Sequence, residues 1–433
     1  MELTDIVVMG SKPLKGVIRA PPSKSMTHRA FIAATLSSGL SIIRDPLICD
    51  DTNATINACR MLGAKIRESE GGVFEVEGCH KILTPENIID CGDSASTMRF
   101  LTPVCALADG ISILTGGASL RRRPMMPLLE AMKQLGIQCY SARGDGYPPI
   151  IVFGGGIRGG RASMPGDVSS QFISGLLFAS PMAQGDTYIE LSTDLESKPY
   201  VLMTIDILHH HKIKVEVNSS FKSFYIPSGQ EYAPSSHMIE GDYSSASFIL
   251  VAAAITGSTV KITNLKGESI QGDRFIIDIL RKAGVKLDVG ENFVRVREAD
   301  RPLQPFSVNL RDHPDLIPAC AVLASYAEGK SVIHGIKRLR FKESDRVAAL
   351  KSEISKMGVK IQVLGDAMEI EGCEEPRGAD FNSYNDHRIA MACITSALGA
   401  TGKSIIHDVE CINKSYPNFI RDITLLGADI LER

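Results

Sequence analysis

The segment Gly257-Ser258-Thr259-Val260 is one of six occurrences of a short phrase: glycine, any residue, Ser or Thr, then an apolar residue. The glycines of successive phrases lie 71 to 75 residues apart, over a chain of 433 residues. The other five phrases begin at Gly39, Gly110, Gly185, Gly329 and Gly402. A fixed spacing along a whole chain is typical of tandem repeats. The sequence therefore predicts six copies of one structural unit.

Each phrase follows a small and apolar stretch of helical length, such as 248–254. A helix that is apolar on all sides is buried, and the glycine after it suits a left-handed helix end. The apolar run after the Ser or Thr predicts a strand. A second helix and strand follow, joined by glycine in every unit except the third, which has Lys212-Ile213 there. Strands that alternate with helices predict an α/β fold.

Length and charge narrow the class of protein. A chain of 433 residues exceeds one core, so we expect two domains of three units, divided near Pro234-Ser235-Ser236. A net charge of −3 gives no global attraction to nucleic acid or to a membrane surface. We see no signal peptide and no apolar run of membrane-spanning length. The ten cysteines show no zinc spacing, so we expect reduced thiols and a cytoplasmic protein.

The first helix of every unit opens on a polar cluster. The six are Ser23-Lys24-Ser25, Asp93-Ser94-Ala95-Ser96, Ser169-Ser170-Gln171, Asp242-Tyr243-Ser244-Ser245, Asp312-His313-Pro314-Asp315 and Asn385-Asp386-His387-Arg388. Helix capping explains Ser, Asp and Asn, and for the fourth cluster it is sufficient. It does not explain Lys24, Arg29, His387 or Arg388. Because a helix N-terminus already attracts anions, cations there indicate that an anion is shared.

Further charged residues follow strands at equivalent points of other units. They are Arg121-Arg122-Arg123, Lys342-Glu343-Ser344-Asp345-Arg346 and Lys414. Each alone is explained by a solvated surface, but their recurrence predicts one cleft lined by cations. Carboxylates among fixed cations, here Asp315 and Glu343, stay ionised and can move protons. The run 209–211 of three histidines has no accompanying metal-ligand spacing, and we expect it to end the second helix of unit three.

These residues resemble the enolpyruvyl transferase family, and within it the branch that acts on shikimate 3-phosphate. The motifs span essentially the whole chain: 22–29, 120–125, 168–172, 197–200, 240–246, 314–315, 342–346, 385–388 and 414–417. The resemblance implies a two-domain enolpyruvyl-transferase-like fold of six βαβαββ repeats, three per domain, with the active site in the interdomain cleft. It assigns 22–235 to one domain, and 1–21 and 236–433 to the other.

The resemblance also implies an activity, which is transfer of the enolpyruvyl group of phosphoenolpyruvate to the 5-hydroxyl of shikimate 3-phosphate, through a tetrahedral intermediate and with release of phosphate. No metal or organic cofactor, nucleic acid or membrane partner is expected, and we expect a monomer. Two substrates with two phosphates and two carboxylates require a site rich in cations and helix N-termini.

Roles carried over by position divide the residues into three sets. The implied shikimate 3-phosphate contacts are Ser25, Arg29, Ser169, Ser170, Gln171, Ser197, Asp315 and Lys342. The implied phosphoenolpyruvate contacts are Lys24, Ala95, Arg123, Gln171, Arg346, Arg388 and Lys414. For catalysis, the resemblance implies that Asp315 accepts the 5-hydroxyl proton, Glu343 protonates the methylene carbon and Lys24 assists the departing phosphate. His387 is expected to orient its neighbours.

One departure from the family pattern leads to a hypothesis about inhibition. Many members have Asn-Ala-Gly-Thr at the second helix start, where this chain has Asp93-Ser94-Ala95-Ser96. The methyl group of Ala95 would crowd glyphosate, a longer analogue that competes with phosphoenolpyruvate, more than it crowds the substrate.

Two other readings stay open from the sequence. The sister enzyme that acts on UDP-N-acetylglucosamine usually carries a reactive Cys in the loop at 117–123, where this chain has none. A non-catalytic repeat protein that binds polyanions would need the cations but not Asp315 or Glu343.

Overall fold

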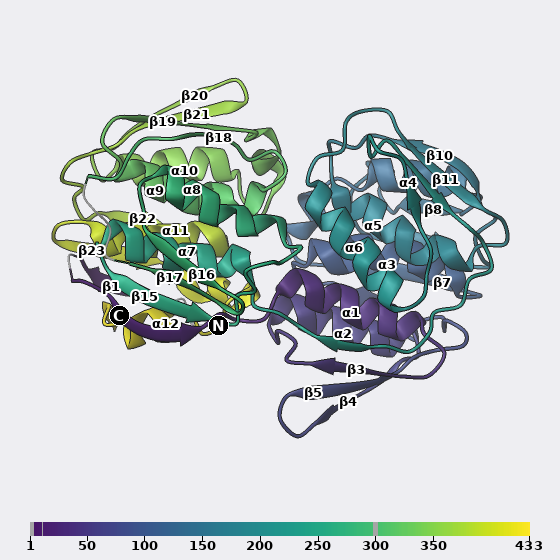
Figure 1. The fold of residues 1–433 in the computed structure, drawn as a ribbon. Coiled ribbons are helices and arrows are strands. Elements are labelled where there is room, and N and C mark those ends of the chain that lie inside the picture. Colours follow the sequence, from purple (N-terminus) through teal and green to yellow (C-terminus); the bar gives the residue numbers. More distant parts are fainter. Residues whose placement is uncertain (1–3, 11, 298–301) are drawn as a thin grey trace. The chain divides into compact units, whose positions relative to one another are not determined.

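The computed structural model describes residues 4–10, 12–297 and 302–433. The chain forms two compact units: an inserted unit, 22–239, and a flanking unit, 1–21 with 240–433 (Figure 1). The sequence placed the second boundary after residue 235, four residues too early. Strand β14 (Ser236–Met238) pairs in parallel with β3 (Leu40–Arg44), and the Ile239 N–H donates to the Arg44 carbonyl. The chain therefore leaves the inserted unit only after Ile239.

In the described residues, the inserted unit holds three four-stranded sheets. In each, the first two strands are parallel and the remaining neighbours are antiparallel. The first sheet has the order β14, β3, β5 (Val73–Glu77), β4 (Lys65–Ser69). The second has the order β6 (Ile89–Asp90), β7 (Ile111–Thr115), β9 (Ile150–Phe153), β8 (Cys139–Ser141). The third has the order β10 (Gly160–Met164), β11 (Thr187–Leu191), β13 (Ser223–Ile226), β12 (Glu216–Val217).

The described residues of the flanking unit also form three sheets of this topology. One has the order β2 (Lys15–Arg19), β15 (Thr259–Thr263), β17 (Phe293–Val296), β16 (Leu287–Gly290). The next has the order β18 (Ser307–Asn309), β19 (Lys330–His334), β21 (Ala367–Glu371), β20 (Lys360–Leu364). The last has the order β22 (Asp380–Asn382), β23 (Lys403–His407), β1 (Ile6–Met9), β24 (Asp429–Glu432). Six sheets of one topology confirm the predicted α/β fold of six repeats.

Each repeat also has a buried helix and a second, more exposed helix. The buried helices are α1 (Lys24–Leu36), α3 (Ala95–Val104), α5 (Ser170–Ala179), α7 (Tyr243–Ile255), α9 (Ile317–Ser325) and α11 (His387–Gly399). The second helices are α2 (Asp50–Met61), α4 (Met126–Gln134), α6 (Lys198–His210), α8 (Ile276–Lys282), α10 (Arg346–Ser355) and α12 (Phe419–Leu425). Within each unit the sheets lie around a group of helices, and one continuous apolar core fills it (Figure 1).

The hydroxyl of the repeated phrase has a structural reason. In four repeats a buried serine at the start of the central strand accepts the backbone N–H of the residue that precedes the neighbouring parallel strand, at 2.6 to 3.2 Å. The pairs, serine first, are Ser41 with Ser235, Ser258 with Leu14, Ser331 with Phe306 and Ser404 with Ala379. In the fourth repeat, Ser258 makes this hydrogen bond in place of Thr259, which is exposed.

The glycine at the end of each second helix takes the expected left-handed conformation. All five have positive φ: Gly63, Gly136, Gly284, Gly358 and Gly427. In the third repeat Lys212 adopts it instead, with φ 66°. After the buried helices the expectation is wrong for Gly110 and Gly185, because short 3-10 helices, η1 (Cys105–Leu107) and η3 (Ser180–Met182), precede them.

The three consecutive histidines end α6, as expected, and the last of them joins a buried pair. His211 Nδ1 lies 2.7 Å from the Ala233 carbonyl oxygen, so it carries the proton, and His211 Nε2 is an acceptor. His237 Nε2, 2.8 Å away, must therefore donate to it. Burial lowers the pKa of His211 to about 4 and that of His237 to about 3.

This pair predicts a loss of stability in acid. Both folded-state pKa values lie below the ordinary 6.5, so the free energy of unfolding is highest above pH 6.5 and falls as the pH drops towards 4. In His237→Gln one of the two groups is gone, and urea midpoints should decline less steeply over this range. The exposed His80→Gln is the control and should follow the parent chain. Equal slopes for all three proteins would contradict the assignment.

Candidate functional site

The polar clusters at the buried helices do cap those helices. Ser23, Ser94, Ser169, Asp242 and Asp386 each accept a backbone N–H from the first turn that follows. In the fifth repeat, Asp315 instead lies within η5 (Pro314–Leu316), directly before α9. Capping therefore uses one residue of each of these five clusters, and the neighbouring side chains remain to be explained.

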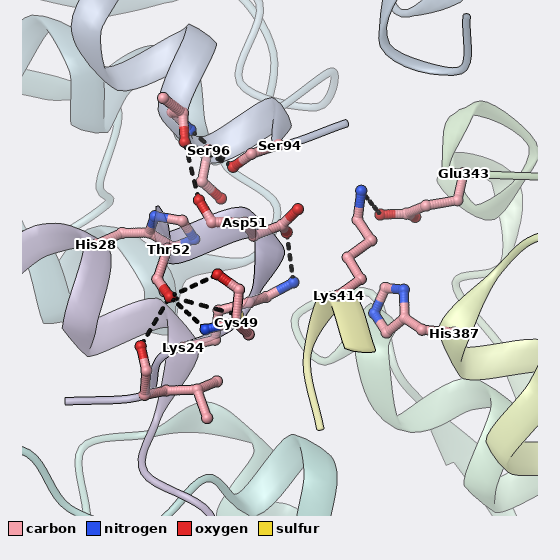
Figure 2. Close-up of polar contacts among 12 residues, drawn as sticks. Lys24, His28, Cys49, Asp51, Thr52, Ser94, Ser96, Glu343, His387 and Lys414 are labelled. Carbon is pink, nitrogen blue, oxygen red and sulfur yellow. Dashed lines mark hydrogen bonds and ion pairs between the residues drawn. The ribbon is translucent and has the colours of Figure 1, made fainter. Parts of the chain in front are cut away.

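In the inserted unit, Lys24 is the first residue of α1 and its Nζ lies 2.7 Å from Asp51 Oδ2 (Figure 2). Asp51 stands in the first turn of α2, and both side chains are largely buried. A carboxylate in this place fixes the ammonium group at the helix start, where its charge opposes the helix dipole. The sequence analysis did not select Asp51, although an acidic first turn is visible there.

Arg29 is the most deeply buried cation of this unit, with 2% of its surface exposed. Its guanidinium donates to Thr204 Oγ1 and to the backbone carbonyls of Ser25 and Tyr200, at 2.7 to 2.8 Å, and it lies over the Phe100 ring. None of these contacts is a carboxylate. Burial lowers the pKa of Arg29 to about 10, which still leaves it charged at neutral pH. This positive charge therefore has no described carboxylate to neutralise it.

A second arginine, Arg99, holds the start of α5 and was missed by the sequence analysis. Its Nη1 donates to Gln171 Oε1 at 2.9 Å and to Ser169 Oγ at 3.3 Å, and its guanidinium lies over the Phe172 ring. Gln171 Nε2 in turn donates to Ser96 Oγ at 2.8 Å. The second and third helix starts are thus joined by side chains. Arg99 lies four residues after Ala95 on α3, and residues four apart share one face of a helix. This spacing from the second polar cluster could have identified it.

The remaining expected residues of this unit are buried or nearly so. Arg123 is 5% exposed and its Nη2 donates to Ser119 Oγ at 3.3 Å. Ala95 begins α3, and Ser170 begins α5. Ser197 precedes α6 in a left-handed conformation with φ 59°. Of the expected site residues in this unit, Lys24, Ser25 and Gln171 are partly exposed and the others are buried.

In the flanking unit, three cations surround the Asp315 carboxylate. Lys342 Nζ and Arg346 Nη1 lie 3.3 and 3.2 Å from Oδ1, and Arg388 Nη2 lies 3.2 Å from Oδ2. Burial alone would raise the pKa of Asp315, but the three cations together hold it well below its ordinary value. Burial also lowers the pKa of Lys342, against the attraction of Asp315. The fifth and sixth repeats thus meet at an ionised carboxylate.

Arg346, the first residue of α10, carries the connections of this network. It binds both oxygens of Asp386, at 2.8 and 3.1 Å, and Glu343 Oε2 at 2.7 Å. Asp386 accepts in addition from the Arg388 backbone N–H at 3.0 Å. Burial disfavours the charge of Arg346, but Asp386, Glu343 and Asp315 outweigh it and raise its pKa. The sequence motif contained Asp386 but gave it no role.

The outer side of Glu343 faces a further cation. Lys414 Nζ lies 3.9 Å from Glu343 Oε1 (Figure 2). His387 Nδ1 lies 3.8 Å from Asp386 Oδ1, and the orienting role expected of His387 stays a prediction. All six expected residues of this unit, and His387 with them, therefore belong to one cluster. Its chemistry is that of anion binding and proton transfer, since carboxylates and cations alternate.

Two kinds of site are not found among the described residues. They contain no group of three or more His, Cys, Asp and Glu side chains arranged to hold a metal ion. They also contain no helix long and apolar enough to cross a membrane.

Comparison with known proteins gives a consistent result. Residues 8–423 match the family model described as EPSP synthase (3-phosphoshikimate 1-carboxyvinyltransferase). The chain is 41% identical over 427 residues to the 3-phosphoshikimate 1-carboxyvinyltransferase of Methanocaldococcus jannaschii, covering 98% of this chain and 99% of that one. It is 42% identical over 425 residues to the enzyme of the same name from Methanothermobacter thermautotrophicus, with the same coverage. The solved EPSP synthase of Acinetobacter baumannii matches over all of both chains, with 25% identity and a TM-score of 0.82.

The network predicts that Asp386 is a stability determinant. Asp386→Asn removes the negative charge of the carboxylate that accepts two hydrogen bonds from the buried Arg346. The free energy of unfolding should therefore fall by about 3 kcal/mol. Urea denaturation measures this change. Glu371→Gln, at an exposed ion pair with Lys360, is the control and should leave the midpoint unchanged. A loss no larger than that of the control would show that Glu343 and Asp315 neutralise Arg346 by themselves.

Proposed function

The chain belongs to the EPSP synthase (3-phosphoshikimate 1-carboxyvinyltransferase) family, and we propose the roles that its own residues play in that reaction. The reaction transfers the carboxyvinyl group of phosphoenolpyruvate to the 5-hydroxyl of shikimate 3-phosphate and releases phosphate. The observation that carries the proposal is the Asp315 carboxylate, which three cations hold in its ionised form. Asp315 lies two residues before the start of α9.

We propose that shikimate 3-phosphate is bound through the hydroxyl groups and the buried arginine of the inserted unit. The residues are Ser25, Arg29, Ser169, Ser170, Gln171 and Ser197, together with Lys342 and Asp315 of the flanking unit. The support is physical: Arg29 is a buried cation whose described contacts are neutral, and an anionic ligand would neutralise it. The hydroxyls at helix starts offer donors to a phosphate.

Phosphoenolpyruvate, in this proposal, is bound by cations of both units. They are Lys24, Arg123, Arg346, Arg388 and Lys414, with Gln171 and the backbone at Ala95. The planar forks of the three arginines suit bidentate contacts with carboxylate and phosphate groups. In the flanking unit, Arg346 and Arg388 already contact carboxylates of the chain. Substrate anions would therefore compete with Asp315 and Glu343 for these cations.

That competition activates the base. Without substrate, three cations depress the pKa of Asp315 and make it a weak base. When substrate anions draw on the same cations, Asp315 becomes more basic and can accept the 5-hydroxyl proton. Glu343 takes up a proton from water when substrate anions draw Arg346 and Lys414 away from it, and it donates this proton to the methylene carbon as the 5-oxygen bonds to C2. Glu343 then takes back one proton of the new methyl group as the C2–phosphate oxygen bond breaks. Lys24 assists the departing phosphate, which takes up the 5-hydroxyl proton from Asp315.

The alternative functions lose support at this point. The sister reaction on UDP-N-acetylglucosamine has no support from the names of the 41–42% identical relatives, which are those of 3-phosphoshikimate 1-carboxyvinyltransferases. A polyanion-binding scaffold does not account for carboxylates at the centre of the cation cluster. We further propose that the enzyme is cytoplasmic, in keeping with ten cysteines that form no disulfide, and that it acts as a monomer. Size-exclusion chromatography tests the monomer.

Removal of either carboxylate tests the reaction. Asp315→Asn and Glu343→Gln should each lower kcat by about 10²–10⁴-fold, because each removes one proton-transfer group. The assay is phosphate release from phosphoenolpyruvate, with and without shikimate 3-phosphate. Calorimetry should still detect shikimate 3-phosphate binding by Glu343→Gln. Near-normal turnover in both variants, beside a Glu371→Gln control, would exclude these roles.

Ala95 predicts tolerance of glyphosate. Its side chain is nearly fully buried at the first position of α3, beside the backbone N–H groups of the helix start. Ala95→Gly removes the methyl group and should lower the glyphosate concentration that halves activity, with a smaller change in KM for phosphoenolpyruvate. Ala131→Gly, a buried helical alanine of α4, controls for the general effect of glycine in a helix. Equal inhibition of the parent chain and Ala95→Gly would refute the hypothesis.

A further inference from the structure

The turn that leads into α11 holds two consecutive residues in a strained backbone conformation. Tyr384 and Asn385 have φ values of 55° and 52°, in the left-handed region. Asparagine tolerates this region, but an aromatic residue rarely adopts it, because its β-carbon crowds the backbone. Asp386, the cap of α11, comes directly after the turn, and Arg388 follows two residues later. The conformation of the turn therefore determines where these two side chains of the proposed site lie.

A buried carboxylate on α10 holds this turn. Glu353 is 1% exposed. Its Oε1 accepts a hydrogen bond from the Tyr384 hydroxyl at 2.9 Å, and its Oε2 accepts one from the Asn382 N–H at 2.9 Å. Lys356 Nζ lies 2.6 Å from Oε2 and neutralises the carboxylate. Glu353 thus binds the chain on both sides of Ser383.

Ser383 connects the same turn to a third element. Its hydroxyl donates to the Asp408 carbonyl at 2.9 Å and accepts the Asn385 N–H at 3.2 Å. Asp408 directly precedes the short helix η7 (Val409–Lys414). The turn therefore joins α10, η7 and α11, and each of these elements carries one proposed contact of phosphoenolpyruvate. These contacts are Arg346, Lys414 and Arg388.

The Tyr384 side chain owes its position to its hydroxyl and not to burial of its ring. Tyr384 is 42% exposed, so its ring gains little from removal from water. Glu353 does not depend on this hydroxyl either, because Lys356 neutralises it and Ser352 Oγ donates to the same carboxylate oxygen at 3.0 Å. Neither partner needs the hydrogen bond for its own burial or charge. What the bond stabilises is therefore the left-handed turn.

We propose that Tyr384 is a positioning residue for the binding of phosphoenolpyruvate, held in that role by its hydrogen bond to Glu353. In the left-handed turn, Asp386 accepts a hydrogen bond from the Arg346 guanidinium, which fixes one proposed contact of this substrate. Arg388, the second residue of α11, is another. Without the Tyr384 hydrogen bond the turn relaxes towards negative φ, both guanidinium groups occupy a wider range of positions, and phosphoenolpyruvate binds more weakly. This inference rests on the proposed roles of Arg346 and Arg388.

Tyr384→Phe tests the hydrogen bond, because it removes the hydroxyl and keeps the ring. KM for phosphoenolpyruvate should rise roughly tenfold, the effect of losing one hydrogen bond to a charged group. Both kcat and KM for shikimate 3-phosphate should change little. Tyr225→Phe is the matched control, because the Tyr225 hydroxyl also donates to a carboxylate, that of Asp186, at 2.8 Å. Steady-state kinetics of phosphate release measure all three constants, and the control should keep the native values.

Tyr384→Ala and Tyr384→Gly separate the strain from the loss of the side chain. Both lack the hydroxyl and the ring, but only alanine keeps the β-carbon that disfavours positive φ. KM for phosphoenolpyruvate should therefore be roughly fivefold higher in Tyr384→Ala than in Tyr384→Gly. If the side chain served stability alone, the two KM values would be equal or the glycine variant would be the worse, since glycine makes the chain more flexible.

Three results would overturn the inference. They are a native KM for phosphoenolpyruvate in Tyr384→Phe, a loss that falls on kcat alone, and equal KM values in the alanine and glycine variants. Since Tyr384 is exposed, the variants should fold, and urea midpoints check this. If the alanine and glycine variants do not fold, Tyr384→Phe alone decides. A native enzyme that releases no phosphate would instead reject the proposed function, so the two failures are distinguishable.

Discussion

The flanking unit is organised around one interaction, the double hydrogen bond between the buried Arg346 guanidinium and Asp386. It joins the start of α10 in the fifth repeat to the cap of α11 in the sixth. Because Arg346 also binds Glu343 and Asp315, this one cation fixes both carboxylates that we assign to proton transfer. A buried guanidinium holds its partners at set distances and angles, which a lysine could not do. Stability and chemistry of this unit therefore depend on the same pair of side chains.

The repeat explains why such residues collect at helix starts. Five of the six buried helices are capped by a side chain, so a polar residue stands there beside the unpaired N–H groups of the helix start. Once the cap is made by one residue, its neighbours are free to differ between repeats. Such neighbouring positions are occupied by two cations, one methyl group and two hydroxyl groups: Lys24, Arg388, Ala95, Ser170 and Ser244. The fold supplies six similar positions, and the side chains at these positions can take different roles.

The sequence predicted what depends on local pattern and missed what depends on contact. The six-phrase spacing was enough for the repeat, the two domains and the helix starts, since these follow from periodicity and capping. The boundary after Ile239 depends on the pairing of β14 with β3, and no local pattern reports that pairing. Asp51, Arg99 and Glu353 were missed for the same reason, because each is defined by a partner 27 to 72 residues away. Asn385 was visible in the sixth cluster, where capping explained it without a further role.

The two units differ in how their charge is balanced, and this difference fits a reaction between anions. In the flanking unit the cations already have carboxylate partners, so an incoming anion exchanges one partner for another at little electrostatic cost. In the inserted unit, the described contacts of Arg29 are all neutral. An anion that binds there would therefore form an ion pair with a guanidinium that no described carboxylate neutralises. Strong binding at Arg29 and exchange at Asp315 serve different purposes. In our proposal, the first holds a substrate, and the second changes the basicity of a carboxylate when substrate binds.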